Sequence, residues 1–351
     1  MKVKLLIATL LFITTNITYS QSKITAIKAG RVIDVVNGLV LNNQVIIIDS
    51  NIIKDMGDNI TIPKNAEVID LSHSTVLPGL IDCHTHITSQ PSGDYYGDIF
   101  RKSPIDYAIT AHIYAKRTLE AGFTSCRDVG SSAFIDVALR NAINNGELIG
   151  PRLQVATLFI GSTGSHGDLN GFSPFLDWQF PKQMSGVADG VNELRKQVRY
   201  NIKYGADVIK FGASAGVLSE EESVGAPQFT QEEMNAIVDE AKIWGRKTCA
   251  HAHGTEAIKM AVKAGVASIE HGSLIDEEGI QLMKQRGTYL VADIYDDDYI
   301  LSEYAKLGYP EKIISKEKMV GKLQRENFAK AVRGGVKIAY GTDAGVYPHG
   351  W

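Results

Sequence analysis

This chain of 351 residues has few cysteines and no excess of basic over acidic residues. The three cysteines, Cys83, Cys126 and Cys249, lie inside apolar runs, and no two of them have CxxC spacing. This argues against a disulfide framework and favours buried free thiols. Lys and Arg together number 36 against 40 Asp and Glu, and they form no long run. The chain therefore lacks the basic stripe that binding to nucleic acid requires.

Long apolar runs are absent as well, except at the start of the chain. Residues 1–4 include two lysines, residues 5–17 are mostly apolar, and small residues follow at positions 18 and 20. The run is shorter than the ~20 residues that a membrane span needs. We therefore expect residues 1–22 to be a cleaved signal peptide rather than a membrane anchor. This predicts an exported protein, periplasmic or secreted, with no membrane span after cleavage.

Residues 23–77 consist of short β-branched runs separated by turns, for example residues 24–28, 44–49 and 67–70. Asn37-Gly38 is typical of a hairpin turn. A sheet of this size is poorly stable alone. We expect a small, sandwich-like β domain over residues 23–77 that packs on another part of the protein.

From residue 78 onward, expected strands alternate with amphipathic helices. The expected strands are residues 79–86, 123–128, 152–159, 206–211, 247–251, 266–271, 288–292 and 336–341. Such alternation predicts an α/β fold with a parallel sheet buried on both faces, and eight strands can close a (β/α)8 barrel of the TIM type over residues 78–351. A doubly wound open sheet is the alternative, which the absence of a GxGxxG motif after any strand disfavours.

Two of the expected helices carry clear boundary signals. Thr230 is followed three residues later by Glu233, which is the pattern of a capping box. Apolar residues then recur at helical spacing from Met234 to Ala241. Gly265 is a plausible end for the helix before it.

His84 and His86 end the first expected barrel strand. Side chains alternate along a strand, so both imidazoles should point into the barrel mouth, where together they could bind one metal ion. An HxH pair alone is weak evidence. Its position strengthens it, because the active sites of such barrels lie at the carboxyl ends of the strands.

Four more polar residues occupy equivalent places: Lys210, His251, His271 and Asp343. Lys210 ends an apolar run, where an unpaired ammonium would be costly. Each residue alone is compatible with a hydrogen-bonded core residue or a strand-end cap. Six such residues at strand ends together indicate one site.

A combination of motifs runs through the chain in a fixed order. It consists of LPGLIDCHTH at 77–86, VIK at 208–210, AHAHG at 250–254, IEHG at 269–272 and GTDAG at 341–345. With these motifs the chain resembles the amidohydrolase superfamily of metal-dependent hydrolases from about Lys23 to its last residue. Within the superfamily it is most similar to the imidazolonepropionase-related branch, which includes Xaa-Pro dipeptidases and carboxypeptidases. Residues 164–168 (GSHGD) and 216–219 (GVLS) are also typical of that branch.

The resemblance implies a binuclear metal site. The implied ligands are His84, His86 and Asp343 for one divalent ion, His251 and His271 for the other, and Lys210, carboxylated by CO2 to a carbamate, as the bridge. Carboxylation would turn a costly buried cation into an anion that two dications stabilise. Zinc suits a His-rich site with a few oxygen ligands, while manganese and iron stay open as alternatives.

The resemblance also implies a reaction, the hydrolysis of an amide or peptide C–N bond by a metal-activated hydroxide. Asp343 would act first as base and then as acid toward the leaving amine. The expected enzyme is a Xaa-Pro dipeptidase or carboxypeptidase-like hydrolase of a small peptide or amide. A cyclic amide hydrolase similar to imidazolonepropionase is an alternative with the same ligands. An inactive exported barrel that binds a metal or another ligand is the alternative from a different class. The chain could also form a homo-oligomer, which the sequence leaves open.

Residues outside the six implied ligands have less defined roles. His166 lies in a long Gly/Ser-rich loop, and His253 lies two residues beyond His251. Each could bind a substrate carboxylate or stabilise a loop through a hydrogen bond. Arg127-Asp128 at the second strand end could be an ion pair or line the pocket. The histidines not expected to be ligands are His73, His112 and His349.

The chain ends at Trp351, shortly after Asp343. The family that it resembles continues with a last barrel helix and further strands that complete the small sheet. We therefore expect that helix and those C-terminal strands to be missing, which would leave apolar surface uncovered. The sequence would then be a fragment or a truncated product that retains all six ligand positions, and its activity as it stands is left open.

Overall fold

The computed structural model describes residues 23–94, 97–176, 180–221 and 223–350. The chain divides into two compact units between Pro78 and Gly79. The expected signal peptide at residues 1–22 lies outside the described residues. Within the described ranges, no helix is both long and apolar enough to cross a membrane.

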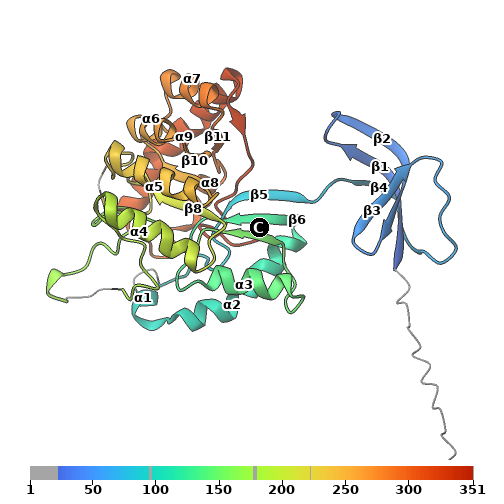
Figure 1. Cartoon of the computed structure of the whole chain (residues 1–351), viewed down its shortest axis with the longest axis horizontal. Helices are drawn as coiled ribbons and strands as arrows, with labels where there is room; N and C mark the ends of the chain where they lie inside the picture. The colour runs from blue at the N-terminus through green and yellow to red at the C-terminus, as the bar shows by residue number, and fades with distance from the viewer. Residues whose placement is uncertain (1–22, 95–96, 177–179, 222, 351) are drawn as a thin grey trace, which may run out of the picture. The chain divides into compact units, whose positions relative to one another are not determined.

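The first unit is a four-stranded sheet, drawn in blue in Figure 1. Its strands are β1 (Ile24–Asp34), β2 (Leu39–Asp49), β3 (Ile52–Gly57) and β4 (Glu67–Val76), in the order β3-β2-β1-β4. β2 runs antiparallel to β1 and β3, whereas β4 is parallel to β1. Residues 23–78 form this one sheet, so the second layer that a sandwich needs stays a prediction.

The expected turn at Asn37-Gly38 is confirmed. It lies in the loop between Asp34 and Leu39, which are paired across the β1–β2 hairpin. Gly38 has a φ of +67°, which a residue without a Cβ adopts at little cost. Ala29, Val32 and Ile46 are buried within the sheet.

The described residues of the second unit contain eight parallel strands in two hydrogen-bonded sheets. One sheet has the order β5 (Leu80–Thr85), β6 (Phe123–Asp128) and β7 (Arg152–Val155). The other has the order β12 (Lys337–Ile338), β11 (Tyr289–Val291), β10 (Ser268–His271), β9 (Lys247–Ala252) and β8 (Val208–Gly212). Isolated parallel bridges join the two sheets at both edges, one between Ile160 and Phe211 and one between Thr85 and Ala344.

Helices lie outside these strands (Figure 1). Their bounds are α1 (Gly97–Arg101), α2 (Pro104–Glu120), α3 (Ile135–Asn144), α4 (Gly190–Lys203), α5 (Gln231–Ile243), α6 (Thr255–Ala264), α7 (Glu277–Arg286), α8 (Asp296–Glu303) and α9 (Glu311–Gly334), with a 3-10 turn at Pro174–Leu176. Apolar residues of α4 to α7 pack with those of β8 to β11 in the largest core. Residues of α2 and α3 pack with β6 and β7 in a second core. The carboxyl ends of the strands remain open for a site.

The boundary signals in the sequence are confirmed. Thr230 caps α5, and its side chain and that of Glu233 form the reciprocal capping box. Gly265 ends α6 with a φ of +100°. All three cysteines are free, with Cys126 and Cys249 buried and Cys83 partly exposed.

All eight expected barrel strands are present, but some are shorter than expected. β7 ends at Val155 rather than at residue 159. Thr157 has a φ of +63°, and its backbone N–H donates to the side chain of Asp136. A residue with this conformation and this partner cannot continue the ladder of the strand.

Candidate active site

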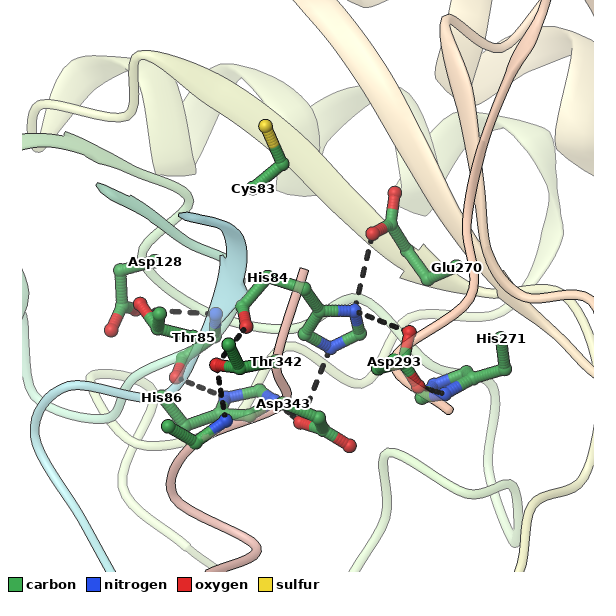
Figure 2. A network of polar contacts seen from close by, with 12 residues as sticks. Cys83, His84, Thr85, His86, Asp128, Glu270, His271, Asp293, Thr342 and Asp343 are labelled. Atoms are coloured by element: carbon green, nitrogen blue, oxygen red, sulfur yellow. Dashed lines mark hydrogen bonds and ion pairs between the residues drawn. The ribbon is translucent and has the colours of Figure 1, made fainter. Parts of the chain in front are cut away.

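His84 and His86 lie at the carboxyl end of β5, as the sequence predicts. Their ring centroids are 5.6 Å apart. His84 Nε2 lies 3.3 Å from Asp343 Oδ1, and His86 Nε2 lies 3.4 Å from the same oxygen. Figure 2 shows both rings directed toward the Asp343 carboxylate. Three of the predicted residues therefore converge on one point.

Asp343 is held in this place by the backbone around it. Its φ of +56° lies in the left-handed region, which a residue other than glycine adopts only when its surroundings impose it. A Cβ at Gly341 would lie 2.9 Å from the Cβ of His84, and one at Gly345 would lie 2.6 Å from the Cβ of His86. The two glycines of the GTDAG motif therefore let this segment approach both histidines closely.

A second group of imidazoles lies at the ends of β9 and β10. The ring centroids of His251 and His271 are 4.5 Å apart, and those of His253 and His271 are also 4.5 Å apart. His84 connects the two groups, because its ring lies 5.0 Å from that of His271. Ligand atoms of His251, His253 and His271 all fall within 4.8 Å of one another, close enough to share one metal ion.

Lys210 lies on β8 and lines the same cavity. It is 1% exposed, and its Nζ lies 5.9 Å from the centre of the Phe159 ring. Among the residues that the structure describes, the side-chain ammonium of Lys210 has no hydrogen-bond or ion-pair partner, although its backbone carbonyl accepts from Ile160. An ammonium buried in this way is costly unless its charge is paired or chemically changed.

Several buried polar atoms around this point have no hydrogen-bond partner among the described residues. They include His251 Nε2, Asp343 Oδ1 and Asp293 Oδ1. Orphaned buried acceptors are rare in folded proteins and call for an explanation. Imidazole nitrogens and carboxylate oxygens that converge without bonding one another are the donor set of a site for divalent metal ions. The residues present therefore fit such ions.

Burial keeps the imidazoles of the site neutral. Desolvation lowers the pKa of His86 to about 4 and that of His271 to about 3, with Lys210 as a further cause in both cases. Desolvation likewise lowers the pKa of His84 and His251 well below the usual value. A histidine binds a metal ion only through an unprotonated nitrogen, so this environment prepares the rings for coordination.

Hydrogen bonds on the far side of the rings fix their orientation. His86 Nδ1 lies 3.0 Å from the carbonyl oxygen of Gly130, and His271 Nδ1 lies 2.6 Å from Asp293 Oδ2. His84 Nδ1 lies 3.1 Å from Glu270 Oε2, an ion-pair distance without hydrogen-bond geometry. Partners of this kind are common behind metal-binding histidines, because they leave Nε2 free to face the ion. Figure 2 shows Glu270 and Asp293 beside His84 and His271.

A cavity of about 550 Å³ extends from these groups. All eight residues singled out in the sequence line it, namely His84, His86, His166, Lys210, His251, His253, His271 and Asp343. The rest of its lining mixes apolar side chains, such as Tyr107, Leu169, Met184 and Leu218, with polar ones such as Asp98 and Lys102. The cavity thus joins a polar floor to a chamber that suits an apolar group.

The two histidines with open roles lie close to the predicted ligands. The His166 ring stacks on that of His251 at 4.2 Å, and His166 Nδ1 is buried without a partner among the described residues. His253 Nδ1 lies 2.8 Å from Ser273 Oγ. Both rings face the cavity, which is compatible with contacts to a substrate.

The three histidines not expected to be ligands lie elsewhere. His73 and His112 are exposed. His349 is buried, with its Nε2 2.9 Å from the carbonyl oxygen of Ser89. Arg127 and Asp128 do not pair with each other. Arg127 instead forms a bidentate ion pair with Glu270 at 2.8 and 2.9 Å.

Sequence reasoning missed four acidic residues around the site. They are Glu270, Asp293, Asp296 and Glu317. Asp293 directly follows the expected strand 288–292, so the rule that found Asp343 could have found it too. Glu270 is part of the IEHG motif, of which only His271 was predicted to bind a metal ion. No local signal marks Asp296 or Glu317, because both belong to helices.

Comparison with known proteins agrees with this geometry. A model of the amidohydrolase family matches residues 75–349. The chain belongs to this family. The ochratoxinase of Aspergillus niger is an amidohydrolase relative with 32% identity over 342 residues, a match that covers 92% of this chain and 69% of that protein.

Two solved structures are similar to this amidohydrolase along most of its length. A Xaa-Pro dipeptidase with methionine bound in its active site has 41% identity and a TM-score of 0.87, over 93% of this chain and 81% of the other. A prolidase complexed with N-methylphosphonate-L-proline has 34% identity and a TM-score of 0.84, over 92% and 78% of the two chains. The resemblance drawn from the motifs is therefore confirmed.

As an amidohydrolase, the chain is a metal-dependent enzyme that hydrolyses C–N bonds, and its parallel strands and outer helices have the TIM-barrel fold of the family. The buried clusters of His and Asp at the carboxyl ends of the strands are consistent with the metal site of such enzymes. This position is where barrels of this type place their active sites.

Proposed function

We propose that this amidohydrolase cleaves the amide bond of a dipeptide or an N-acyl amino acid and that the released amine is an amino acid, with proline as the first candidate. The observation that carries the proposal is the convergence of the predicted polar residues on the floor of one cavity whose wall also carries apolar side chains. Such a cavity can hold a small substrate with an apolar side chain and present its carbonyl to the polar floor.

The polar floor would hold two divalent ions, with zinc as the first candidate. The residues that would bind them are His84, His86 and Asp343 for one ion, His251 and His271 for the other, and Lys210 as a carbamate formed with CO2. The unpartnered atoms His251 Nε2 and Asp343 Oδ1 support this assignment. Carboxylation of Lys210 would replace a buried, unpaired cation by an anion suited to two dications. When bound, the metal ions supply Lewis acidity and lower the pKa of water.

Asp343 would move the proton of the reaction. Its carboxylate lies next to His84 and His86 on the cavity floor, where it can accept a proton from the attacking water. It would then donate that proton to the departing nitrogen. The nitrogen of a proline leaving group needs a proton as the C–N bond breaks, because an amide anion is a poor leaving group.

His166 and His253 are proposed to contact the substrate carboxylate. Both rings line the cavity; His253 is buried and His166 is partly buried. A carboxylate accepts hydrogen bonds from imidazole N–H groups, and such bonds would orient the released amino acid. His253 also belongs to a group of three histidines that could hold a metal ion, so its replacement reports on metal content as well.

The similar proteins support this choice of substrate class. Two of the similar structures are a Xaa-Pro dipeptidase and a prolidase, and the latter is complexed with a phosphonate derivative of proline. The ochratoxinase favours a second candidate, the hydrolysis of an N-acyl amino acid without a free amine. Both candidates require the same polar floor and differ in what the chamber accepts.

A substrate screen tests the proposal. The purified protein is loaded with zinc, and release of free amino acid is measured from Xaa-Pro dipeptides, N-acyl prolines, ochratoxin and cyclic amides, including an imidazolone. We expect metal-dependent release of proline, abolished by a chelator and restored by zinc. Hydrolysis of the cyclic amides alone would overturn the proposal. Stoichiometric metal binding without hydrolysis of any compound would favour a non-catalytic binding protein.

Export remains a proposal of its own. Residues 1–22 have the charge and length pattern of a cleaved signal peptide. Expression of the full chain with its own N-terminus, followed by fractionation and N-terminal sequencing, should locate the mature protein outside the cytoplasm with a start near residue 21 or 23. A mature chain that begins at Met1 in the cytoplasm would contradict this.

A further inference from the structure

Two buried carboxylates line the cavity from the helices between β11 and β12. Asp296 begins α8, and Glu317 lies on α9. Asp296 is 8% exposed and Glu317 is 3% exposed. Asp296 Oδ1 and Glu317 Oε1 have no hydrogen-bond partner within the part of the chain that the structure describes. Neither residue belongs to the six implied metal ligands.

Neighbouring acidic residues on α8 have ordinary partners. Asp296, Asp297 and Asp298 occupy the first turn of α8, where the helix dipole favours negative charge. Arg325 pairs with Asp297 at 2.5 Å and with Asp298 at 2.9 Å. Asp296 alone of the three lines the cavity. The helix start explains the presence of an acid there, but not its unpaired position on the cavity wall.

Lys316, which precedes Glu317 on α9, bonds to backbone groups instead. Lys316 Nζ donates to the backbone carbonyls of Gly216, Ser219 and Glu221 at 2.9, 2.6 and 2.9 Å. No Lys, Arg or His of the described residues forms an ion pair with Asp296 or Glu317. Buried carboxylates without a direct ion-pair partner are costly, and such groups in a cavity are candidates for a functional site.

The pKa values of the two carboxyls also indicate that positive charge is lacking around them. Burial, followed by the charge of Asp297, raises the pKa of the Glu317 carboxyl to about 7. Burial, Asp293, Asp343 and then Glu317 raise the pKa of Asp296 well above its usual value. A cationic group bound between the two carboxyls would relieve this repulsion.

The distance between Asp296 and Asp343 indicates how far apart the two ends of a bound group would be. Ligand atoms of His271, Asp293, Asp296 and Asp343 lie within 4.8 Å of one another. In an α-amino acid residue the nitrogen is about 2.5 Å from the carbonyl carbon, as follows from standard bond lengths and angles. A primary ammonium at Asp296 would therefore place the adjacent carbonyl over the cavity floor near Asp343.

We propose that Asp296 and Glu317 bind the free α-ammonium of the N-terminal residue of the substrate, so that the enzyme acts on unblocked dipeptides. This inference rests on the proposed function and selects between its two candidates. An ammonium has three hydrogen-bond donors and no acceptor. It therefore matches two carboxylates that each have an oxygen without a hydrogen-bond donor. An N-acyl amino acid without this amine would leave both carboxylates unpaired.

The test compares two substrates that differ only in the amine, Leu-Pro and 4-methylpentanoyl-Pro. With the zinc-loaded protein we expect kcat/KM for Leu-Pro to be at least about 30-fold higher, the ratio that loss of one partner of a buried charge pair gives. Asp296→Asn and Glu317→Gln should each lower this ratio by about 10-fold or more. The matched controls are Asp298→Asn on α8 and Glu326→Gln on α9, both exposed, and they should leave the ratio unchanged.

Zinc content and melting temperature complete the test. Asp296→Asn and Glu317→Gln should retain the zinc content of the unsubstituted protein and melt no lower, because each removes an unpaired buried charge. Equal kcat/KM for the two substrates in the unsubstituted protein would overturn the inference while the proposed function stands. An equal loss for both substrates in Asp296→Asn, together with lost zinc, would also overturn it and would identify Asp296 as a metal ligand. Failure to release proline from any peptide or acyl compound would refute the proposed function itself.

Discussion

The Asp82 carboxylate accepts two hydrogen bonds from Thr342, one from the backbone N–H at 3.1 Å and one from the hydroxyl at 2.5 Å. It also accepts a bond from the backbone N–H of His84 at 3.1 Å. Asp82 thereby ties β5 to the segment that follows β12, with His84 and Asp343 beside the tie. The relative position of two proposed metal ligands depends on this buried side chain.

Replacement of Asp82 should loosen that connection. Asp82→Ala leaves two backbone N–H groups and a hydroxyl without their buried partner, which should lower the free energy of unfolding by about 3 kcal/mol. Zinc content should fall as well, because Asp343 is no longer held beside His84. Urea denaturation and elemental analysis measure the two effects. Asp239→Ala, an exposed aspartate on α5, is the control and should change stability by less than about 0.5 kcal/mol.

The ion pair between Arg127 and Glu270 lies directly beside His84 of the site. Glu270 is fully buried, and Arg127 also donates to the Cys83 carbonyl at 2.5 Å. Arg127→Met would leave the Glu270 charge uncompensated, so we expect a loss of about 3–5 kcal/mol in the free energy of unfolding. The double variant Arg127→Met/Glu270→Gln should recover part of that loss. If the single variant is as stable as the unsubstituted protein, the pair has no such role.

Local sequence pattern predicted the strands and the residues at their ends. The six proposed ligands lie in or shortly after strands whose apolar runs are visible in the sequence, and parallel strands bring their carboxyl ends to one edge. They are His84, His86, Lys210, His251, His271 and Asp343. The motif resemblance supplied their proposed roles. The capping box at Thr230 was predictable for the same reason, since both partners lie three residues apart.

Pairings over long sequence distances could not be predicted in this way. Arg127 and Glu270 are separated by 143 residues, and only the folded sheet brings them together. Asp296 and Glu317 face the cavity because of how α8 and α9 pack, and no local periodicity sets which acid of the first turn of α8 points inward. The early end of β7 depends on Asp136, a side chain of α3 that replaces a strand partner.

Glu240 on α5 should make stability dependent on acid pH. Arg199 donates to it at 2.6 and 3.0 Å, and Trp244 Nε1 donates at 3.0 Å. Hydrogen bonds from Arg199 are the largest cause that lowers the pKa of Glu240 from 4.5 to about 2. Because the pKa of the folded state is the lower one, the stabilisation is complete above about pH 5 and is lost as the pH falls from 4.5 toward 2.

The variant Glu240→Gln tests this dependence. At pH 7 we expect it to unfold with about 1–3 kcal/mol less free energy than the unsubstituted protein, as for a hydrogen bond to a charged group. The difference between the two proteins should be nearly unchanged when urea denaturation is repeated at pH 5 and should shrink at pH 4 and 3. A difference that stays constant over this range would show that the charge of Glu240 does not contribute.

Lys210 has the most specific proposed role, because a plain ammonium cannot bridge two cations. Lys210→Ala should remove the bridge and lower activity by several orders of magnitude, since the nucleophile depends on the metal ions. A small carboxylic acid added to this variant should restore part of the activity by taking the place of the carbamate. Lys210→Glu should retain more metal than Lys210→Ala, because a carboxylate can still bridge. Lys263→Ala, an exposed lysine on α6, is the matched control.

Metal stoichiometry of Lys210→Ala tests the account most directly. Elemental analysis after zinc loading and removal of free ion should give close to two ions per chain for the unsubstituted protein and for Lys263→Ala, and one or fewer for Lys210→Ala. Two ions bound to Lys210→Ala, together with hydrolysis at the unsubstituted rate, would contradict the bridging role of Lys210. The binuclear site would then have to give way to a single ion held by His84, His86 and Asp343.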